Sequence, residues 1–267
     1  MRQQLNSETL DLFGKPRSVE LTQEYWNAIL VIAFCRHDHM KFSEESGRSR
    51  GTFKNLMGQI GGIMGEVSFL RFLSRCPGIR ILHGLATRCD TGKCDMKIFV
   101  GGAWINAEIK THLILPNKFL FMIYEGAHEI SKQKGMDFYV PFISAFGSDV
   151  ALMGRLLSPD DVDKWAVANH GYKTEPKEEP LNSICPLYFN DNFSAIETRL
   201  YDHKNLFGMP TRDINGLIER ESLEFVDVDL FCRAGAIFYQ KAYAEGYTSR
   251  PFDETIMLAL ECLKLAK

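Results

Sequence analysis

The chain has 267 residues, of which 45% are hydrophobic, 12% aromatic and 24% charged. This composition is typical of a globular protein and excludes disorder as a description of the whole chain. The amino-terminal segment lacks the apolar run of a signal peptide, and the longest apolar run, residues 28–35, is too short to span a bilayer. The seven cysteines show no disulfide spacing. We therefore expect a cytoplasmic protein that makes no contact with a membrane.

The charge is distributed unevenly along the chain. The net charge is −3, but residues 41–110 carry 11 basic and 6 acidic side chains, a local net of +5 against −8 for the rest. Such asymmetry indicates that one surface could meet phosphate groups. A solvated basic surface with no partner is the alternative interpretation.

The first two predicted elements are helices. Residues 21–35 have helical composition, with Thr22 as the N-cap. Residues 52–75 have apolar side chains at helical spacing, although four glycines between positions 58 and 65 require either close packing or a break. The predicted stripe consists of Phe53, Leu56, Ile60, Ile63, Val67 and Leu70.

Strands and helices then alternate. Residues 94–100 and 103–111 are predicted strands, residues 125–134 a helix that ends at Gly135, and residues 138–144 a strand that Pro141 places at an edge or a bulge. Residues 150–153 form a further candidate strand, and Ser158 and Pro159 begin a helix. Beyond about residue 195 the pattern is mostly helical and ends in a helix over 253–267. This order predicts a mixed α/β core with helical additions.

The two strands at 94–111 define a hairpin. Gly101-Gly102 between alternating strands indicates a two-residue turn, which pairs Phe99 with Trp104 and places Asp95 opposite Glu108. Period-two alternation puts these carboxylates on one face of the sheet together with Lys110. The other face is apolar and consists of Met96, Ile98, Val100, Ile105, Ala107 and Ile109.

Two carboxylates directly opposite each other repel unless a cation lies between them. A divalent ion would remove this repulsion, and clustered oxygen ligands with open positions suit Mg²⁺. The alternative is an ordinary charged sheet face in which Lys97 or Lys110 pairs with the acids.

A third carboxylate lies on the predicted helix 52–75. Glu66 follows Ile63 by three residues and precedes Leu70 by four, so it points inward or toward a cleft. It either joins Asp95 and Glu108, or is satisfied by a backbone donor or by one of Arg71, Arg75 and Arg80.

An inward Glu66 on a helix, Asp95 on a strand and Glu108-Ile109-Lys110 on the next strand resemble the PD-(D/E)xK nuclease superfamily, which includes many restriction endonucleases. The resemblance covers roughly residues 52–155. One departure is Cys94 in place of the proline before Asp95. The resemblance implies an α/β fold with a restriction-endonuclease-like core, a mixed central sheet flanked by helices, with N- and C-terminal helical additions. The corresponding divisions are an N-terminal helical segment 1–51, the nuclease core 52–195 and a helical extension 196–267.

The resemblance also implies a mechanism. Glu66, Asp95, Glu108 and Lys110 would be catalytic, and Asp95, Glu108 and the Ile109 carbonyl would bind Mg²⁺, for which Mn²⁺ would substitute. Lys110 would hold or deprotonate the attacking water, and Glu66 would orient water or assist a second ion. Basic residues beside these positions are candidate nucleic-acid contacts: Arg48, Arg50, Lys54, Lys93 and Lys97.

The expected function is Mg²⁺-dependent cleavage of DNA by a restriction-type endonuclease, with a homodimer expected by family analogy. A repair or recombination nuclease acting on ends, junctions or single strands is one alternative, and a non-cleaving nucleic-acid-binding protein is another. No nucleotide cofactor is expected, because residues 58–65 lack the Lys-Ser/Thr of a P-loop. A Cys/His hydrolase using Cys94 or Cys185 with His112 or His170 has no supporting sequence context.

Overall fold

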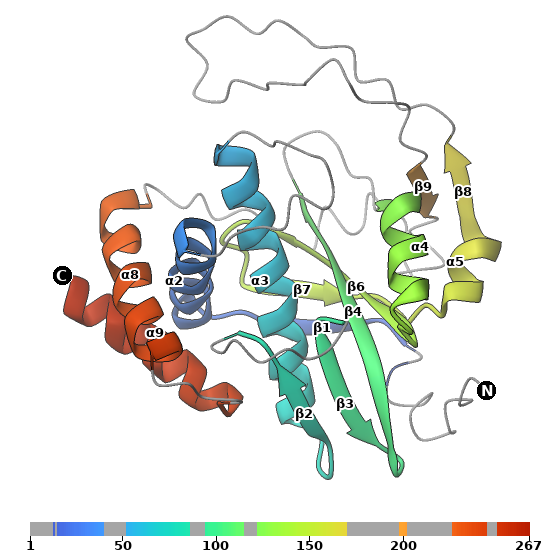
Figure 1. Ribbon diagram of the computed structural model, residues 1–267, viewed down its shortest axis with the longest axis horizontal. Coiled ribbons are helices and arrows are strands. Elements are labelled where there is room, and N and C mark those ends of the chain that lie inside the picture. Colours follow the sequence, from blue (N-terminus) through green and yellow to red (C-terminus); the bar gives the residue numbers. More distant parts are fainter. Residues whose placement is uncertain are drawn as a thin grey trace, which may run out of the picture.

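The computed structural model describes residues 13, 15–39, 52–85, 94–114, 122–169, 198–201, 226–244 and 250–267 and has a mixed α/β fold (Figure 1). The strands are β1 (Arg17–Glu20), β2 (Arg80–His83), β3 (Met96–Val100), β4 (Ala103–Ile114), β5 (Met122–Tyr124), β6 (Phe138–Ala145), β7 (Val150–Met153), β8 (Ala166–Asn169) and β9 (Thr198–Tyr201). The helices are α2 (Gln23–His39), α3 (Thr52–Ser74), α4 (Glu125–Gln133), α5 (Pro159–Trp165), α8 (Val228–Ala244) and α9 (Phe252–Ala266).

The main sheet has six strands in the order β1-β7-β6-β4-β3-β2. Strands β4 and β6 are parallel and all other neighbours in this sheet are antiparallel, so the sheet is mixed. A second sheet has the order β5-β9-β8. The described residues beyond 195 are mostly helical, as expected, with one exception: the strand at Thr198–Tyr201, which pairs with β5 and β8.

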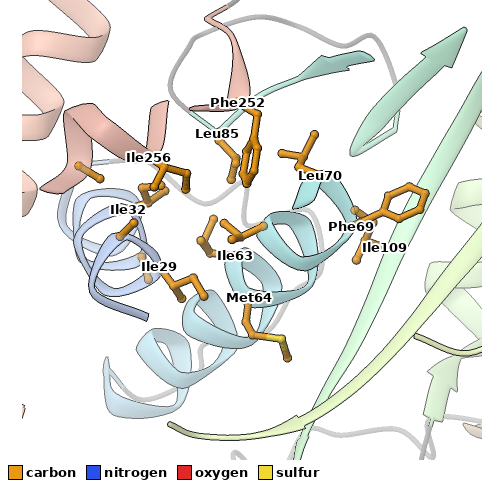
Figure 2. Packing of buried hydrophobic residues seen from close by; sticks show 14 of the residues in the cluster. Ile29, Ile32, Ile63, Met64, Phe69, Leu70, Leu85, Ile109, Phe252 and Ile256 are labelled. Carbon is orange, nitrogen blue, oxygen red and sulfur yellow. The ribbon is translucent and has the colours of Figure 1, made fainter. Parts of the chain in front are cut away.

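One face of the main sheet is covered by α3; α2 packs against α3, and α8 and α9 pack against α2 and against each other (Figure 1). Their apolar side chains form one buried cluster with the sheet. Figure 2 shows its centre, where Ile32 of α2, Ile63 of α3 and Ile256 of α9 converge. Burying each such side chain contributes about 1.5–3 kcal/mol relative to leaving it exposed. The cluster therefore joins segments before residue 52 and after residue 195 to the sheet.

Helix α3 is continuous through its glycines. Gly65 is buried against β4, where a Cβ atom would overlap Thr111 Oγ1 and lie 2.8 Å from Ile109 Cγ2. Gly62 is exposed, with nothing within 4 Å of a Cβ atom there. Of the two sequence-based alternatives, close packing is therefore correct at Gly65.

The turn and register of the hairpin were predicted correctly, although β3 begins at Met96, so the expected pairing of Asp95 with Glu108 lies one residue beyond the ladder. Gly101 (φ 59°) and Gly102 (φ 84°) both have left-handed backbone, as a type I′ turn requires. Phe99 pairs with Trp104, and the ladder extends to Met96 opposite Ala107. Alternation then divides the faces, with Met96 and Ala107 fully buried on the side of α3.

Helix ends follow the sequence in two places. The α4 helix ends at Gly135 (φ 75°), with the Gly135 N–H bonded to Lys132 O and the Met136 N–H to Ser131 O. The α5 helix begins after Ser158, whose Oγ accepts from the Asp161 N–H.

Two local predictions were wrong or incomplete. The Thr22 hydroxyl caps no helix: it is buried without a hydrogen-bond partner, and only the Thr22 carbonyl accepts, from Trp26 N. Pro141 lies in an interior strand, so the edge alternative is wrong and the bulge alternative fits: two residues separate Tyr139 from Phe142, whereas three separate Met153 from Leu157. The missing N–H of Pro141 is tolerated because pairing between β6 and β7 stops at Phe142 and Met153 and resumes in a single bridge from Tyr139 to Leu157.

Candidate active site

The hairpin presents the expected acidic and basic residues on one sheet face. Glu108 and Lys110 alternate along β4 with the buried Ile109, and the Lys110 Nζ lies 2.7 Å from Glu108 Oε1. Asp95 directly precedes β3, one residue beyond the last ladder pair. Both Glu108 and Lys110 are largely buried, with side chains 16% and 25% exposed. The contact between them is therefore partly shielded from solvent.

The carboxylate of Asp95 turns toward the next strand. Its Oδ2 accepts a 2.7 Å hydrogen bond from the backbone N–H of Ile109. Burial and the carboxylates of Glu108 and Glu66 raise the pKa of Asp95 to about 7, against the smaller opposing effects of Lys110 and the Ile109 N–H. Asp95 is thus the acid whose pKa the negative charges of Glu108 and Glu66 both raise.

Glu66 has a cationic partner from another helix. Arg36, near the end of α2, donates from Nη1 to Glu66 Oε1 at 2.8 Å and from Nη2 to Oε2 at 3.2 Å. The same Nη2 donates to the carbonyl of Gly84 at 3.1 Å. Burial lowers the pKa of Arg36, but Glu66 outweighs this effect and holds the pKa above its ordinary value. Glu66 is therefore fixed by a bidentate ion pair.

The three arginines predicted as alternative partners of Glu66 contact other groups. Arg71 lies 3.0 Å from Glu20, and Arg75 lies 3.9 Å from the same carboxylate oxygen. The Arg80 guanidinium lies over the ring of Phe99. These arginines lie where α3 ends or beyond it, whereas Glu66 is nearer the middle of the helix and faces α2.

Arg36 was not predicted as a partner of Glu66. A signal was present in the sequence. Arg36 follows Ile32 by four residues, as Leu70 follows Glu66, so each charge interrupts the buried stripe of its own helix. Two opposite charges on buried stripes are expected to pair when the two helices pack together.

The C-terminal helices reach this region through Tyr243 of α8. Burial raises the pKa of Tyr243 to about 12, and the neighbouring Arg36 acts in the opposite direction. Burial and Arg36 also lower the pKa of His83 to about 4. Tyr243 and His83 are therefore uncharged at neutral pH, and Arg36 is the cation that faces Glu66.

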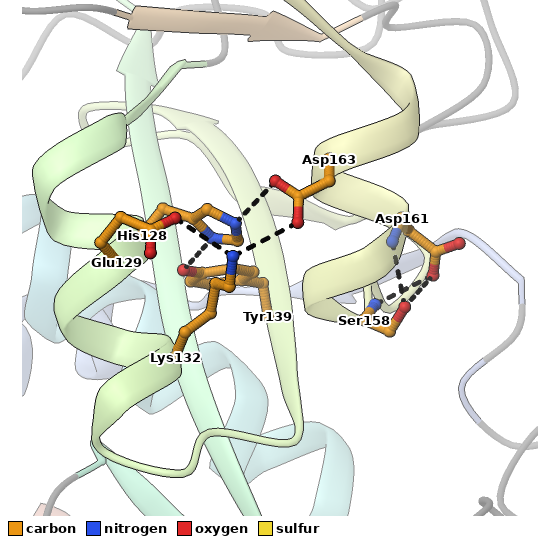
Figure 3. A network of polar contacts seen from close by, with 7 residues as sticks. All are labelled: His128, Glu129, Lys132, Tyr139, Ser158, Asp161 and Asp163. Atoms are coloured by element: carbon orange, nitrogen blue, oxygen red, sulfur yellow. Dashed lines mark hydrogen bonds and ion pairs between the residues drawn. The ribbon is translucent and has the colours of Figure 1, made fainter. Parts of the chain in front are cut away.

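Lys110 rests against an aromatic ring that sequence analysis did not identify. The Lys110 Nζ lies 5.8 Å from the ring centroid of Tyr139, which is opposite Glu108 in the parallel register. Behind the ring, the Tyr139 hydroxyl lies 2.9 Å from His128 Nδ1, and His128 Nε2 lies 3.3 Å from Asp163 Oδ1 (Figure 3). This network joins β6 to α4 and α5 and fixes the ring beneath Lys110.

The charges of the site do not balance. Among the residues described at this site, three carboxylates (Glu66, Asp95, Glu108) lie near two cations (Arg36, Lys110). Arg36 pairs with Glu66 and Lys110 with Glu108, and no described residue forms an ion pair with Asp95. Asp95 and Glu108 supply the hard oxygen donors that suit Mg²⁺, and one oxygen of each is not used in the contacts described above. Within the described ranges, no group of three or more His, Cys, Asp or Glu side chains could hold a metal ion. Any Mg²⁺ ion would take two side-chain carboxylates, with backbone, water or phosphate oxygens completing its shell.

The predicted nucleic-acid contacts are mostly outside the described residues. This holds for Arg48, Arg50 and Lys93, and the side chain of Lys54 at the start of α3 is likewise not described. Lys97 lies on β3 opposite Asn106, on the face of Glu108 and Lys110. Cys94 Sγ contacts the carbonyl of Met96 at 3.2 Å.

Among the helices that the structure describes, none is both long enough and apolar enough to cross a membrane. Comparison of the chain with protein-family models, with curated proteins and with solved structures gives no match.

Proposed function

We propose that this protein is a Mg²⁺-dependent nuclease that hydrolyses phosphodiester bonds of DNA and has a restriction-endonuclease-like core. Within this class, a restriction-type endonuclease is the first candidate. The observation that carries the proposal is the carboxylate of Asp95, whose pKa the carboxylates of Glu108 and Glu66 help to raise and for which the described part of the chain offers no ion pair. It lies beside a Glu108-Ile109-Lys110 segment whose ammonium and carboxylate are in contact.

Each residue then has a defined part. Asp95 and Glu108 would hold Mg²⁺, which when bound supplies a Lewis acid for the phosphate and for the attacking water. Lys110, fixed by Glu108 and the Tyr139 ring, can donate a hydrogen bond to that water or to a phosphate oxygen. Arg36 holds Glu66 in place, so that Glu66 adds negative charge near Asp95 without free rotation.

One observation favours a second candidate, a nucleic-acid-binding protein that does not cleave. Glu66 and Glu108 already have cationic partners in Arg36 and Lys110, so two of the three carboxylates need no metal. Asp95 discriminates between the two functions, because a non-cleaving protein gains nothing from a buried carboxylate with a raised pKa.

The test is cleavage of plasmid, linear duplex and single-stranded DNA in Mg²⁺, Mn²⁺ or EDTA. We expect metal-dependent cleavage that Lys110→Ala and Asp95→Ala each reduce by about 10²-fold or more. Lys241→Ala, which changes an exposed lysine paired with Glu261 on the C-terminal helices, is the control and should cut at the wild-type rate. Discrete fragments from a plasmid would identify a sequence-specific endonuclease, whereas progressive shortening would identify an end-directed enzyme. No cleavage of any substrate, with DNA binding intact, would overturn the proposal in favour of the binding protein.

A further inference from the structure

Three side chains form a row across β2, β3 and β4, near the hairpin turn. Arg80 is opposite Phe99, and Phe99 is opposite Trp104. The Arg80 guanidinium lies 4.1 Å from the Phe99 ring centroid and 5.8 Å from that of Trp104. The two rings meet edge to face at 5.4 Å. We call these three residues the aromatic row.

The indole of the row is exposed although its neighbours hold it in place. Trp104 is 43% exposed, one of five large hydrophobic residues so exposed in the part of the chain that the structure describes. The other four, Ile130, Val228, Met257 and Leu265, lie on helices. Phe99 and Arg80 lie against part of the indole, and the exposed part of the residue is open to a ligand. A fixed, exposed aromatic ring beside a guanidinium is a typical stacking platform for nucleic-acid bases.

The aromatic row lies on the sheet face that carries Glu108 and Lys110 of the candidate active site. Trp104 and Glu108 are four residues apart on β4, which at about 3.3 Å per residue is roughly 13 Å. This corresponds to a few nucleotides along one strand. Lys97 lies on this face between the two positions. A DNA strand lying along β4 would therefore pass Arg80 and Lys97 before it reaches Lys110. The phosphates of this DNA strand would lie near these three cations.

We propose that the aromatic row binds unpaired bases of single-stranded DNA, or of a single-stranded end, that leads into the active site. This inference rests on the proposed nuclease function and, among its forms, favours a nuclease that acts on single strands or ends over a restriction-type endonuclease that cuts duplex DNA. A base can stack on Trp104 only if one face of the base is free. In a duplex, both faces of a base are covered by the neighbouring base pairs. The row therefore selects unpaired nucleotides, and duplex DNA would contact it through phosphates alone.

The test measures binding of a fluorescein-labelled single strand and of a blunt duplex to the full chain in EDTA, where no cleavage occurs. We expect Trp104→Ala to weaken single-strand binding by between about five-fold and 150-fold. Trp104→Phe, which keeps a ring, should change it by no more than a few fold. Met257→Ala, which removes an exposed apolar side chain from α9, is the matched control and should leave binding unchanged.

A second measurement does not depend on the alanine variant folding. Adding the unlabelled single strand should quench the tryptophan fluorescence of the wild-type protein, and the quenching should be lost in Trp104→Phe. Unchanged single-strand affinity in Trp104→Ala, or quenching that persists in Trp104→Phe, would overturn the inference. Equal weakening of blunt-duplex binding would also overturn it, in favour of a duplex-binding surface.

The two proposals fail separately. Metal-dependent cleavage that requires Lys110, without any effect of Trp104 on binding, would overturn the proposed role of the aromatic row and still support the nuclease function. Trp104-dependent binding without cleavage of any substrate would support the row as a single-strand surface and overturn the nuclease.

Discussion

The Arg36 guanidinium and the Glu66 carboxylate make two contacts, of 2.8 and 3.2 Å, between helices α2 and α3. The pair is largely buried, with side chains 16% and 10% exposed. It lies beside Asp95, so the acid that would bind a metal is held within a fixed set of charges. The N-terminal helix α2 is thereby part of the candidate active site as well as of the core.

Replacing Arg36 should destabilise the protein and disturb the site together. We expect Arg36→Ala to lower the free energy of unfolding by about 3 kcal/mol, because it leaves the Glu66 carboxylate buried without its partner. Urea denaturation at pH 8 measures this change. Arg75→Ala, which removes an exposed arginine 3.9 Å from Glu20, should cost no more than about 0.5 kcal/mol. Similar losses in the two variants would contradict the assigned importance of the Arg36–Glu66 pair.

Neutralising Asp95 should stabilise the metal-free protein at alkaline pH. Its pKa rises from 3.8 to about 7 on folding, so stability is lost as pH increases from about 4 to about 7 and the whole penalty is present above that range. Asp95→Asn removes the penalty and keeps an acceptor for the Ile109 N–H. Its unfolding free energy in EDTA should exceed that of the wild type at pH 8, by an amount on the order of a few kcal/mol, and the gap should close toward pH 4.

The same titration would govern binding of the proposed Mg²⁺ ion. Because Mg²⁺ competes with the Asp95 proton, its stabilising effect on the melting temperature should grow between pH 6 and pH 8 and be absent in Asp95→Asn. A Mg²⁺ effect that is equal in both proteins would place the ion elsewhere.

The buried His83 should give a pH dependence of the opposite sign. Burial and Arg36 lower its pKa from 6.5 to about 4, so its contribution is fully present above pH 6.5 and is lost as pH falls toward 4. The loss amounts to about 3 kcal/mol when the whole interval is crossed. His83→Asn should flatten the fall in unfolding free energy between pH 6.5 and pH 4.5 relative to the wild type. An unchanged slope would show that His83 has the same pKa in the folded protein as in the unfolded chain.

Two glycines of α3 should respond in opposite directions to alanine. Gly65→Ala should destabilise by about 1–3 kcal/mol, because its methyl group would overlap Thr111 and push α3 away from β4. Gly62→Ala meets nothing within 4 Å and should stabilise by up to about 1 kcal/mol through helix propensity. Thermal unfolding of the two variants checks both signs. If nuclease activity is found, Gly65→Ala should also lower it, because Glu66 would move with the helix.

The sequence by itself determined the hairpin and the placing of its charges. Gly101 and Gly102 permit the left-handed turn, and once that turn is set, alternation leaves one register in which Met96 and Ala107 face the core. Helix α3 and the cap at Ser158 were likewise predictable, because periodicity and capping depend on residues close together in the chain.

Only the tertiary structure decided which charges neutralise which. Arg36 and Glu66 are 30 residues apart, and the choice of Arg36 over Arg71, Arg75 and Arg80 depends on how α2 packs against α3. The ring of Tyr139 comes beneath Lys110 because β4 and β6 are parallel neighbours, a pairing that no local pattern encodes. Propensity and periodicity act within one element, whereas these contacts join elements, and their energy becomes available only after the elements have packed.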